Sequence, residues 1–331
     1  MRSQKSNIGL DIGSFSIKLT EIEPLDKNKK KLKLMNFYLE DIKDRKIEEV
    51  LGNIVDKLKL KKRFVNVAVG GEAVIVRLIN IPKMTKEELN SSLRFEAEKF
   101  IPFDIKEVEV RAQILRDDLK DNKMQVLLAA VKRKNIEDLV KLIINAGLVP
   151  GVIDVEAFVL YNAYEISHPG IKETCLLLNI GDKFSNINIL EEGILAFSRD
   201  IFIGGRVFTG ELIKKFELED KKATELKKIP GEKKEEMLEI LKPLFLNLKS
   251  ELNSSIDYFE TQFQKKVAKL YFSGGGAYLE GLREFFEQSL EIETEILDCF
   301  AAMEKDSLVN AADLNKNKGH LAMAMGLALR G

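Results

Sequence analysis

The chain has 331 residues, a length that fits either one large domain or two medium-sized lobes. Apolar residues make up 45% of the sequence, enough for a sizeable buried core, and the formal net charge is −1. This charge balance excludes an overall basic field for nucleic acid, so that only a local basic patch is left as a possibility. The two cysteines and two histidines form no cluster and predict no zinc site, and no apolar run reaches the roughly 18 residues of a membrane span.

The first part of the chain has the pattern of a sheet covered by a helix. An apolar meander is predicted over 8–23 and 32–39. Apolar residues then recur at helical spacing over 47–60. Residues 64–79 are predicted to fold back as a two-stranded hairpin around Gly70-Gly71. The order is therefore strand, strand, strand, helix and strand.

At Thr85 the pattern changes. Thr85 and Glu88 form a capping box that starts a helix, and Pro102 ends this helix. Two strand-like segments and a further helix follow. We therefore expect 84–150 to be a compact α/β insert, and a helix over 154–166 to return the chain to the first lobe.

The second half repeats this plan. Three strands are followed by a helix, and the next part is rich in Lys and Glu with helical spacing, where Pro230-Gly231 and Pro243 are expected to break the helix. The predicted elements are strands at 175–180, 185–190, 194–199, 268–273 and 293–297, and helices at 205–216, within 216–266, at 279–290 and from about Lys318.

A glycine turn joins the first two predicted strands, in the sequence Asp11-Ile12-Gly13-Ser14-Phe15-Ser16-Ile17-Lys18. Backbone N–H groups and hydroxyls in such a turn point toward one place, which suits phosphate oxygens. Strand alternation puts Lys18 on the same side as Ser14 and Ser16, where it adds a cation. Asp11 is a candidate to hold Mg²⁺ through water. Taken alone, an ordinary hairpin explains this motif equally well.

A related turn opens the second half, in the sequence Asn179-Ile180-Gly181-Asp182-Lys183-Phe184-Ser185-Asn186. Each turn follows an apolar strand and begins one half of the chain. Two such turns that face each other would hold a polyphosphate from both sides. Their pairing favours a phosphate site more strongly than either turn alone.

Two further glycine clusters lie at strand-to-helix junctions. Gly204-Gly205 precedes a predicted helix, where a close approach between lobes or to phosphate would explain both glycines. Gly274-Gly275-Gly276 follows a predicted strand and leaves the backbone open to a flat or anionic ligand. The spacing is not that of a dinucleotide fingerprint, and a tight connection is the alternative explanation.

In this order the elements resemble the actin-like ATPase superfamily, in which two phosphate hairpins and an adenosine loop hold a nucleotide between two lobes. Within it, nearly the whole chain is similar to the PilM family of type IV pilus assembly proteins, which is related to FtsA. The segments that carry the resemblance are Ile81–Leu89, Phe95–Asp104, Ala146–Leu148, Ile153–Glu156, Arg199–Ile201, Ile203–Gly205 and Ala324–Arg330.

The resemblance implies an actin-like (ribonuclease H-like) two-lobed α/β fold with a small insert subdomain. The first lobe would comprise 1–83, 151–172 and 316–331, and the FtsA-like insert 84–150. The second lobe would be 173–315, including a helical subdomain at 206–266.

The resemblance also implies ATP and Mg²⁺ in the cleft, with Asp11 at the metal. Glu225 and Lys228 look like the pair that this group places near the ribose and adenine. The complete set of implied nucleotide-binding residues is Asp11, Gly13, Ser14, Ser16, Lys18, Asn179, Gly181, Ser185, Asn186, Gly204, Gly205, Glu225, Lys228, Gly274, Gly275 and Gly276.

PilM-like proteins take an extended peptide from the cytoplasmic tail of the membrane protein PilN, in a groove between the insert and the first lobe. The resemblance thus implies a cytoplasmic protein held at the inner membrane through its partner, with self-association possible and no role for nucleic acid. One departure from the family pattern is Asn179, where active members carry Asp. Because an amide is a poor proton acceptor, we expect ATP binding with slow or absent hydrolysis and assign no catalytic residue.

Two alternatives stay open at this stage. An ATP hydrolase or kinase of the same fold would need a carboxylate base at the second hairpin, and Asn179 argues against it. An FtsA-like cell-division protein or filament-forming ATPase would be expected to carry an amphipathic helix after a linker, whereas this sequence ends at Arg330-Gly331.

Overall fold

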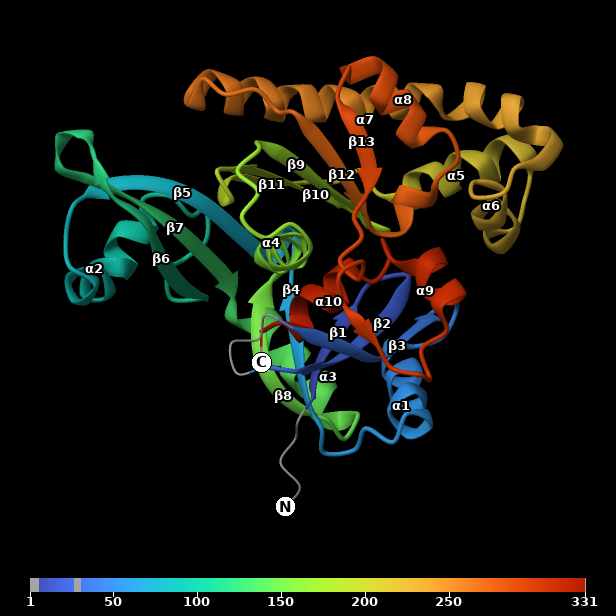
Figure 1. The fold of residues 1–331 in the computed structure, drawn as a ribbon, viewed down its shortest axis with the longest axis horizontal. Coiled ribbons are helices and arrows are strands. Elements are labelled where there is room, and N and C mark those ends of the chain that lie inside the picture. Colours follow the sequence, from blue (N-terminus) through green and yellow to red (C-terminus); the bar gives the residue numbers. More distant parts are fainter. Residues whose placement is uncertain (1–5, 27–30, 331) are drawn as a thin grey trace.

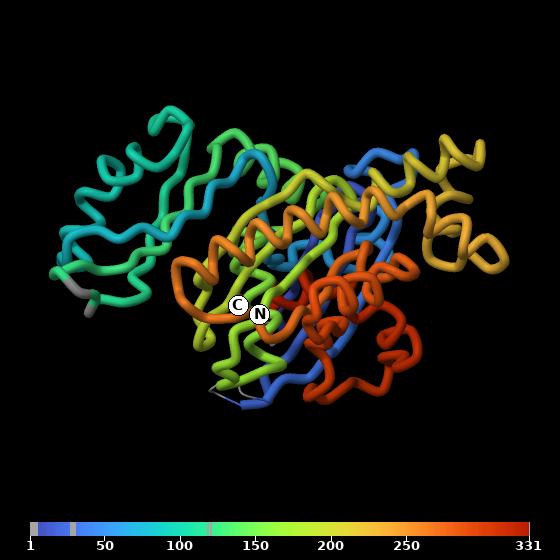
Figure 2. The backbone as a smooth tube through the Cα atoms, turned by 90° about the horizontal axis from the view of Figure 1, so that it is seen from above, coloured from blue at the N-terminus to red at the C-terminus, as the bar shows by residue number. Residues whose placement is uncertain are grey.

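The structure, a computed structural model, describes residues 6–26 and 31–330. These residues form three β-sheets, two of which belong to lobes that lie on either side of a pair of helices (Figure 1). The third sheet projects to one side. Figure 2 shows this projecting unit at one end of the molecule and the region around residue 225 at the other.

The first lobe is built on a six-stranded sheet. Its order is β14-β3-β2-β1-β4-β8, in which β1, β2 and β3 form the predicted antiparallel meander and β4 pairs in parallel with β1 and β8. Apolar residues of α1 and α3 pack against Ile8, Leu10 and Val65 of the sheet. The elements are β1 (Asn7–Ile12), β2 (Ser16–Pro24), β3 (Leu32–Asp41), α1 (Ile47–Lys57), β4 (Phe64–Val69), α3 (Arg133–Asn145), β8 (Val149–Val155), β14 (Glu304–Lys305) and α9 (Ala311–Asn317).

The second lobe is built on a five-stranded sheet in the order β11-β10-β9-β12-β13. The predicted break at Pro243 is wrong, because α7 continues through this residue. Pro243 lies on the exposed side of the helix, while Met237, Leu241 and Phe245 are buried and hold both sides of it in the core. The elements are β9 (Cys175–Ile180), β10 (Ser185–Glu191), β11 (Ile194–Ile201), α5 (Gly205–Phe216), α6 (Asp220–Leu226), α7 (Lys234–Phe263), β12 (Lys269–Ser273), α8 (Leu282–Leu290) and β13 (Glu293–Ile296).

The third sheet belongs to the insert and has the order β5-β7-β6, formed by β5 (Val74–Pro82), β6 (Val108–Leu119) and β7 (Lys123–Lys132). The hairpin predicted over 64–79 is wrong: β4 joins the first-lobe sheet, whereas β5 pairs with β7. The predicted capping box of α2 (Lys86–Glu98) is confirmed, since Glu88 N–H donates to Thr85 Oγ1 over 3.2 Å.

The predicted insert of 84–150 leaves out β5 and takes in α3, which packs on the first lobe. We therefore propose 74–132 as the extent of the insert. Likewise, β14 pairs with β3, so we propose that this strand belongs to the first lobe, although the predicted second lobe of 173–315 includes it. The remaining domain boundaries stay predictions.

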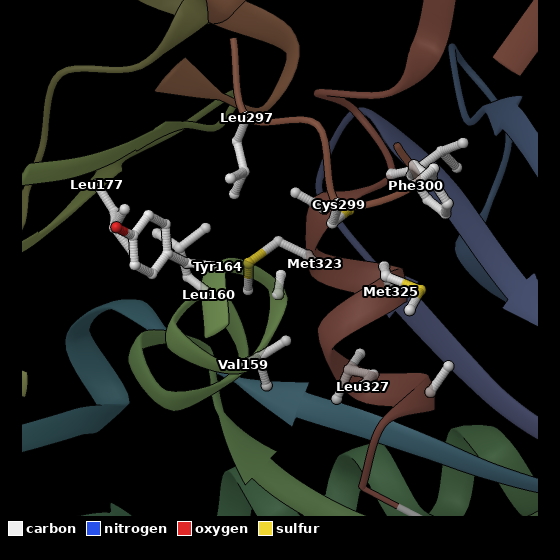
Figure 3. Packing of buried hydrophobic residues seen from close by; sticks show 14 of the residues in the cluster. Val159, Leu160, Tyr164, Leu177, Leu297, Cys299, Phe300, Met323, Met325 and Leu327 are labelled. Carbon is white, nitrogen blue, oxygen red and sulfur yellow. The ribbon is translucent and has the colours of Figure 1, made fainter. Parts of the chain in front are cut away.

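Two helices lie between the lobes, α4 (Glu156–Ser167) and α10 (Ala322–Ala328). Figure 3 shows their buried side chains meeting Leu177 of the second lobe in one apolar core. Their backbones are in close contact with neighbouring elements: a Cβ on Gly9 of β1 would lie 1.9 Å from the Ala324 oxygen, and one on Gly326 would lie 2.0 Å from the Val159 oxygen. Glycine is therefore required at both positions. α4 connects β8 of the first-lobe sheet to β9 of the second-lobe sheet.

Candidate functional site

Two glycine turns, one from each lobe, meet across the cleft. In the first turn the Gly13 N–H donates to the Ser16 carbonyl oxygen over 3.1 Å, and in the second the Gly181 N–H donates to the Phe184 carbonyl oxygen over 3.0 Å. The two turns thus close in the same way. Ser14 Oγ of the first turn donates to Asp182 Oδ2 of the second over 3.0 Å, so that the turns lie face to face.

A cavity of about 540 Å³ lies between these turns, a size typical of small-molecule sites. Most of the predicted nucleotide-binding residues line it. They are Asp11, Gly13, Ser14, Ser16, Lys18, Asn179, Gly181, Gly205, Lys228, Gly274, Gly275 and Gly276.

Ser185 and Asn186 do not line this cavity, and the sequence-based expectation is corrected for both. The turn ends at Phe184, so these residues already belong to strand β10. Ser185 Oγ donates to the Ile203 carbonyl oxygen over 2.6 Å. Asn186 Nδ2 donates to Asp200 Oδ1 over 2.7 Å, which fixes β10 to β11.

Gly204 and Glu225 also lie outside the cavity lining. A Cβ on Gly204 would lie 2.4 Å from the Asp182 oxygen, so this glycine allows the second turn to pack on the start of α5. Glu225 is on α6, whose cavity face instead presents Thr224, with Lys227 and Lys228 just beyond the helix. The expected Glu-x-x-Lys pair therefore brings only its lysine to the cavity.

The first turn carries an ion pair. Asp11 and Lys18 are cross-strand partners on β1 and β2, and Lys18 Nζ lies 2.9 Å from Asp11 Oδ2. The two side chains are only 16% and 13% exposed, so solvent screens their charges less than at the surface. Asp11 thus holds the ammonium group at the cavity wall, where it can meet an anion.

The second turn carries amides at the matching place. Asn179 and Asn186 are cross-strand partners on β9 and β10. Asn179 Oδ1 accepts a hydrogen bond from Ser273 Oγ over 3.1 Å, and the residue is buried. The side chain is thereby held by its own sheet and contributes no charge to the cavity.

The three consecutive glycines after β12 do not all serve the same purpose. A Cβ on Gly274 would lie 2.4 Å from the Ile180 oxygen, and one on Gly276 would lie 2.1 Å from Ile180 Cγ2. Both are needed for packing on the second hairpin. Gly275 has no such contact: the nearest atoms to a Cβ there belong to the His320 ring at 3.8 Å. Gly275 is thus the glycine whose bare backbone is free to face a ligand.

Lys227 was missed by the sequence analysis. Its Nζ donates to the Gly205 oxygen over 3.0 Å and to Thr209 Oγ1 over 2.7 Å. Gly205 N–H in turn donates to the Gly181 oxygen over 2.8 Å, so that Lys227 braces the second turn through the start of α5. Burial lowers the pKa of Lys227 to about 8, and the nearby Lys228 charge adds to this effect.

Glu156 was also missed. It begins α4 and lies against the β4–β5 connection, where a Cβ on Gly70 would be 2.3 Å from the Glu156 carboxyl carbon. The pKa of Glu156 is raised to about 8, mainly by desolvation; the charges of Asp11 and Asp200 contribute to the increase and that of Lys18 opposes it. No local motif marks Glu156, because its position depends on where α4 returns to the cleft.

A second cavity, of about 370 Å³, lies between the insert and the second lobe. Val74–Arg77 of β5 form one side, Phe197–Asp200 of β11 the other, and Val155–Ala157 close it from the first lobe. Both β5 and β11 are edge strands of their sheets. Gly70 and Glu156 line this cavity as well as the first, and are thus a wall shared by the two.

The two lobes and the paired turns define a protein of the actin-like class. Solved structures with this fold include EutJ and MreB5. The ethanolamine utilization protein EutJ from Carboxydothermus hydrogenoformans matches with a TM-score of 0.58 and 15% identity, covering 99% of this chain and 91% of its own. MreB5 of Spiroplasma citri bound to AMPPNP matches with a TM-score of 0.54 and 12% identity, covering 99% and 96%.

A family model and a structure of higher similarity identify the family of this chain. The family model of the type IV pilus assembly protein PilM matches residues 9–331. A solved PilM-PilN type IV pilus biogenesis complex matches with a TM-score of 0.86 and 26% identity, covering 98% of both chains. The chain therefore belongs to the PilM family of type IV pilus assembly proteins. None of the helices in the described part of the chain is both long and apolar enough to cross a membrane.

Proposed function

We propose that the chain is an ATP-binding scaffold of the type IV pilus assembly platform, which holds the cytoplasmic N-terminal peptide of a PilN-like membrane protein. Membership of the PilM family supports the biological role. The observation that carries the nucleotide part is the bridge from Ser14 to Asp182, which closes two equivalent turns over one cavity. The partner would keep the protein at the inner membrane.

The residues around the cavity fit a nucleoside triphosphate. Gly13 and Gly181 belong to turns whose backbones face the cavity, and Lys18 supplies a positive charge beside the first turn. Gly275 leaves room for the uncharged part of the ligand. MreB5, which shares the fold, was solved with AMPPNP. ATP, when bound, would supply negative phosphate oxygens, which Lys18 and the backbones of the two turns would hold.

Asp11 is the residue of the first turn that fits Mg²⁺. No group of three His, Cys, Asp or Glu side chains able to hold a metal occurs within 6–26 and 31–330. The usual Mg²⁺ site in nucleotide-binding proteins combines one or two carboxylates with phosphate oxygens and water. Asp11 would serve as that carboxylate.

The second cavity is our proposed place for the partner peptide. Its walls include two edge strands, β5 and β11, and an edge strand can pair through its backbone with an extended peptide. Val76, Phe197 and Phe202 add apolar contacts, and the buried Asn186 Oδ1, which has no hydrogen-bond partner, can accept a donor from the peptide. This cavity meets the second lobe as well as the first, unlike the groove expected from the resemblance.

Both ligands would touch the wall formed by Gly70 and Glu156, which gives a route for coupling between them. Such coupling requires that each ligand binds one closure state more tightly than the other. ATP in the first cavity would then change the affinity of the second for the peptide.

Slow ATP hydrolysis is a second candidate, and one observation favours it. Glu156 places a carboxyl group with a pKa of about 8 in the wall of the first cavity, within the range suited to proton transfer near neutral pH. Asn179 in place of a carboxylate still argues for slow turnover.

The proposal is tested by calorimetry with ATP-Mg²⁺ and with peptides from the cytoplasmic tail of the PilN-like protein, each alone and in the presence of the other. We expect both to bind and ATP to change the peptide affinity. A peptide affinity that is the same with and without ATP would contradict the coupling. The protein would then be an adaptor that binds the peptide independently of nucleotide. Absence of ATP binding would overturn the nucleotide assignment.

A further inference from the structure

His320 lies in the wall of the first cavity, although its position in the sequence suggested only the start of the last helix. It belongs to the segment between α9 and α10. Two other aromatic rings line the cavity, Phe15 and Phe184, and each belongs to one of the glycine turns. His320, by contrast, lines the cavity from a segment that belongs to neither turn.

The His320 ring is held in a fixed orientation. It stacks on Tyr278, with ring centroids 4.4 Å apart and planes inclined by 17°. The Tyr278 hydroxyl accepts a hydrogen bond from the Gly319 N–H over 2.9 Å. The Gly274 N–H donates to the Gly319 oxygen, also over 2.9 Å, which ties this segment to the glycine run. The ring is therefore placed by the same backbone that leaves Gly275 open.

The ring is uncharged at neutral pH. Burial lowers the pKa of His320 to about 3, and the charges of Lys228 and Lys18 contribute to this shift. A neutral imidazole is a weak ligand for phosphate compared with the ammonium group of Lys18. It is well suited to contact with an uncharged, flat group, because aromatic rings stack on nucleobases irrespective of their sequence.

We propose that His320, stacked on Tyr278 beside Gly275, contacts the nucleoside part of the bound nucleotide and contributes to affinity without contacting the phosphates. This inference rests on the proposed nucleotide-binding function. With the phosphates at the two turns, the remainder of the ligand extends toward the wall formed by Gly275, Lys228 and His320. Lys18 and His320 thus act on different parts of one ligand.

The test compares ATP and AMP, which share the nucleoside and differ in the β- and γ-phosphates. We expect His320→Ala to weaken the binding of both by about the same factor, roughly tenfold, in line with the loss of one stacked ring. His320→Phe keeps a ring of similar size and is expected to stay within about threefold of the wild type. Lys18→Ala is expected to weaken ATP far more than AMP, because it acts on the phosphates.

His168→Ala is the matched control. His168 also stacks on a tyrosine, Tyr164, with ring centroids 4.5 Å apart, and it is not among the residues that line the first cavity. It should leave both affinities unchanged. The inference is overturned if His320→Ala leaves ATP affinity intact, if it weakens ATP much more than AMP, or if His320→Phe loses as much as His320→Ala. A wild-type protein that binds neither nucleotide would instead overturn the proposed function.

Discussion

The two hairpins have similar backbone turns but differ in the side chains of the cross-strand pair beside the turn. In each hairpin we compare the cross-strand pair that lies next to the pair flanking the turn. It is Asp11 with Lys18 in the first hairpin and Asn179 with Asn186 in the second. The first pair is an ion pair at the cavity wall, whereas the second is two amides held by their own sheet. The repeated unit therefore supplies similar geometry in both lobes, while its cross-strand pair is charged only in the first. We expect the first hairpin to determine affinity for phosphate and the second to determine closure.

The largest difference between the hairpins is expected when the two matching residues, Lys18 and Asn186, are each changed to alanine. Lys18→Ala removes the cation and leaves Asp11 unpaired beside the phosphates, so that ATP affinity should fall by about a hundredfold, or about 2.7 kcal/mol. Asn186→Ala should leave ATP affinity within about threefold and lower the free energy of unfolding by about 1–2 kcal/mol, because Asp200 loses a buried partner. Calorimetry and urea unfolding measure the two effects. Equal losses of affinity would contradict the assignment of charge to the first hairpin.

The lysine that braces the second turn, Lys227, gives a pH test. Lys227 donates to neutral oxygens behind the second turn, and its pKa of about 8 lies below the ordinary value near 10.5. Above pH 8 the folded protein releases this proton while the unfolded chain keeps it, so stability rises with pH up to about 10.5.

Relative to a Lys227→Met variant, the free energy of unfolding of the wild type should therefore increase by about 2 kcal/mol between about pH 8 and pH 9.5. Below pH 8 the difference should be flat. Urea unfolding across this range checks the prediction, and a difference that is constant throughout would show that Lys227 has an ordinary pKa.

Asn179→Asp places a carboxylate at the position that matches Asp11 and so makes the cross-strand pairs of the two hairpins more alike. Ser273 Oγ can still donate to the new carboxylate, which keeps the side chain in place. We expect single-turnover release of phosphate from ATP to speed up by about tenfold, since a carboxylate can accept a proton and orient water. Fast release by the wild type, or no gain in the variant, would contradict the proposed reason for slow turnover.

Ser14→Ala tests the contact between the turns and should have the smallest effect. It removes the hydrogen bond to Asp182, which still keeps its ion pair with Arg206 at 2.8 Å. ATP affinity should fall about threefold, or about 0.7 kcal/mol, as expected for one hydrogen bond that is partly exposed to solvent. A loss as large as that of Lys18→Ala would mean that Ser14 binds the ligand directly.

The parts of the site that the sequence predicts are those with a local signal. Gly13 and Gly181 stand out because each follows an apolar strand and is followed by polar turn residues. The same reasoning extended the second turn two residues too far, and thereby took in Asn186 as well as Ser185, which starts the next strand. Its partner is the Ile203 oxygen, a contact that strand alternation alone does not reveal.

The parts that could not be predicted depend on non-local packing. The pattern at 64–79 is that of two strands around glycines, and nothing in it states that β4 and β5 join different sheets. Glu156, Lys227 and His320 reach the first cavity because α4, α6 and the segment before α10 return to it from separate places in the chain. Pro243 shows the same limit for helices, since tertiary packing on both sides outweighs its local effect.

The shared wall at Gly70 and Glu156 has a practical consequence for inhibitor design. A side chain at position 70 would displace the Glu156 carboxyl group, so even a small substitution there would shift one face of this partition. A small molecule that occupies the cavity beside β5 would press on the same carboxyl group that borders the other compartment. Compounds selected for blocking a protein–protein contact on this scaffold should therefore be expected to alter its nucleotide occupancy as well.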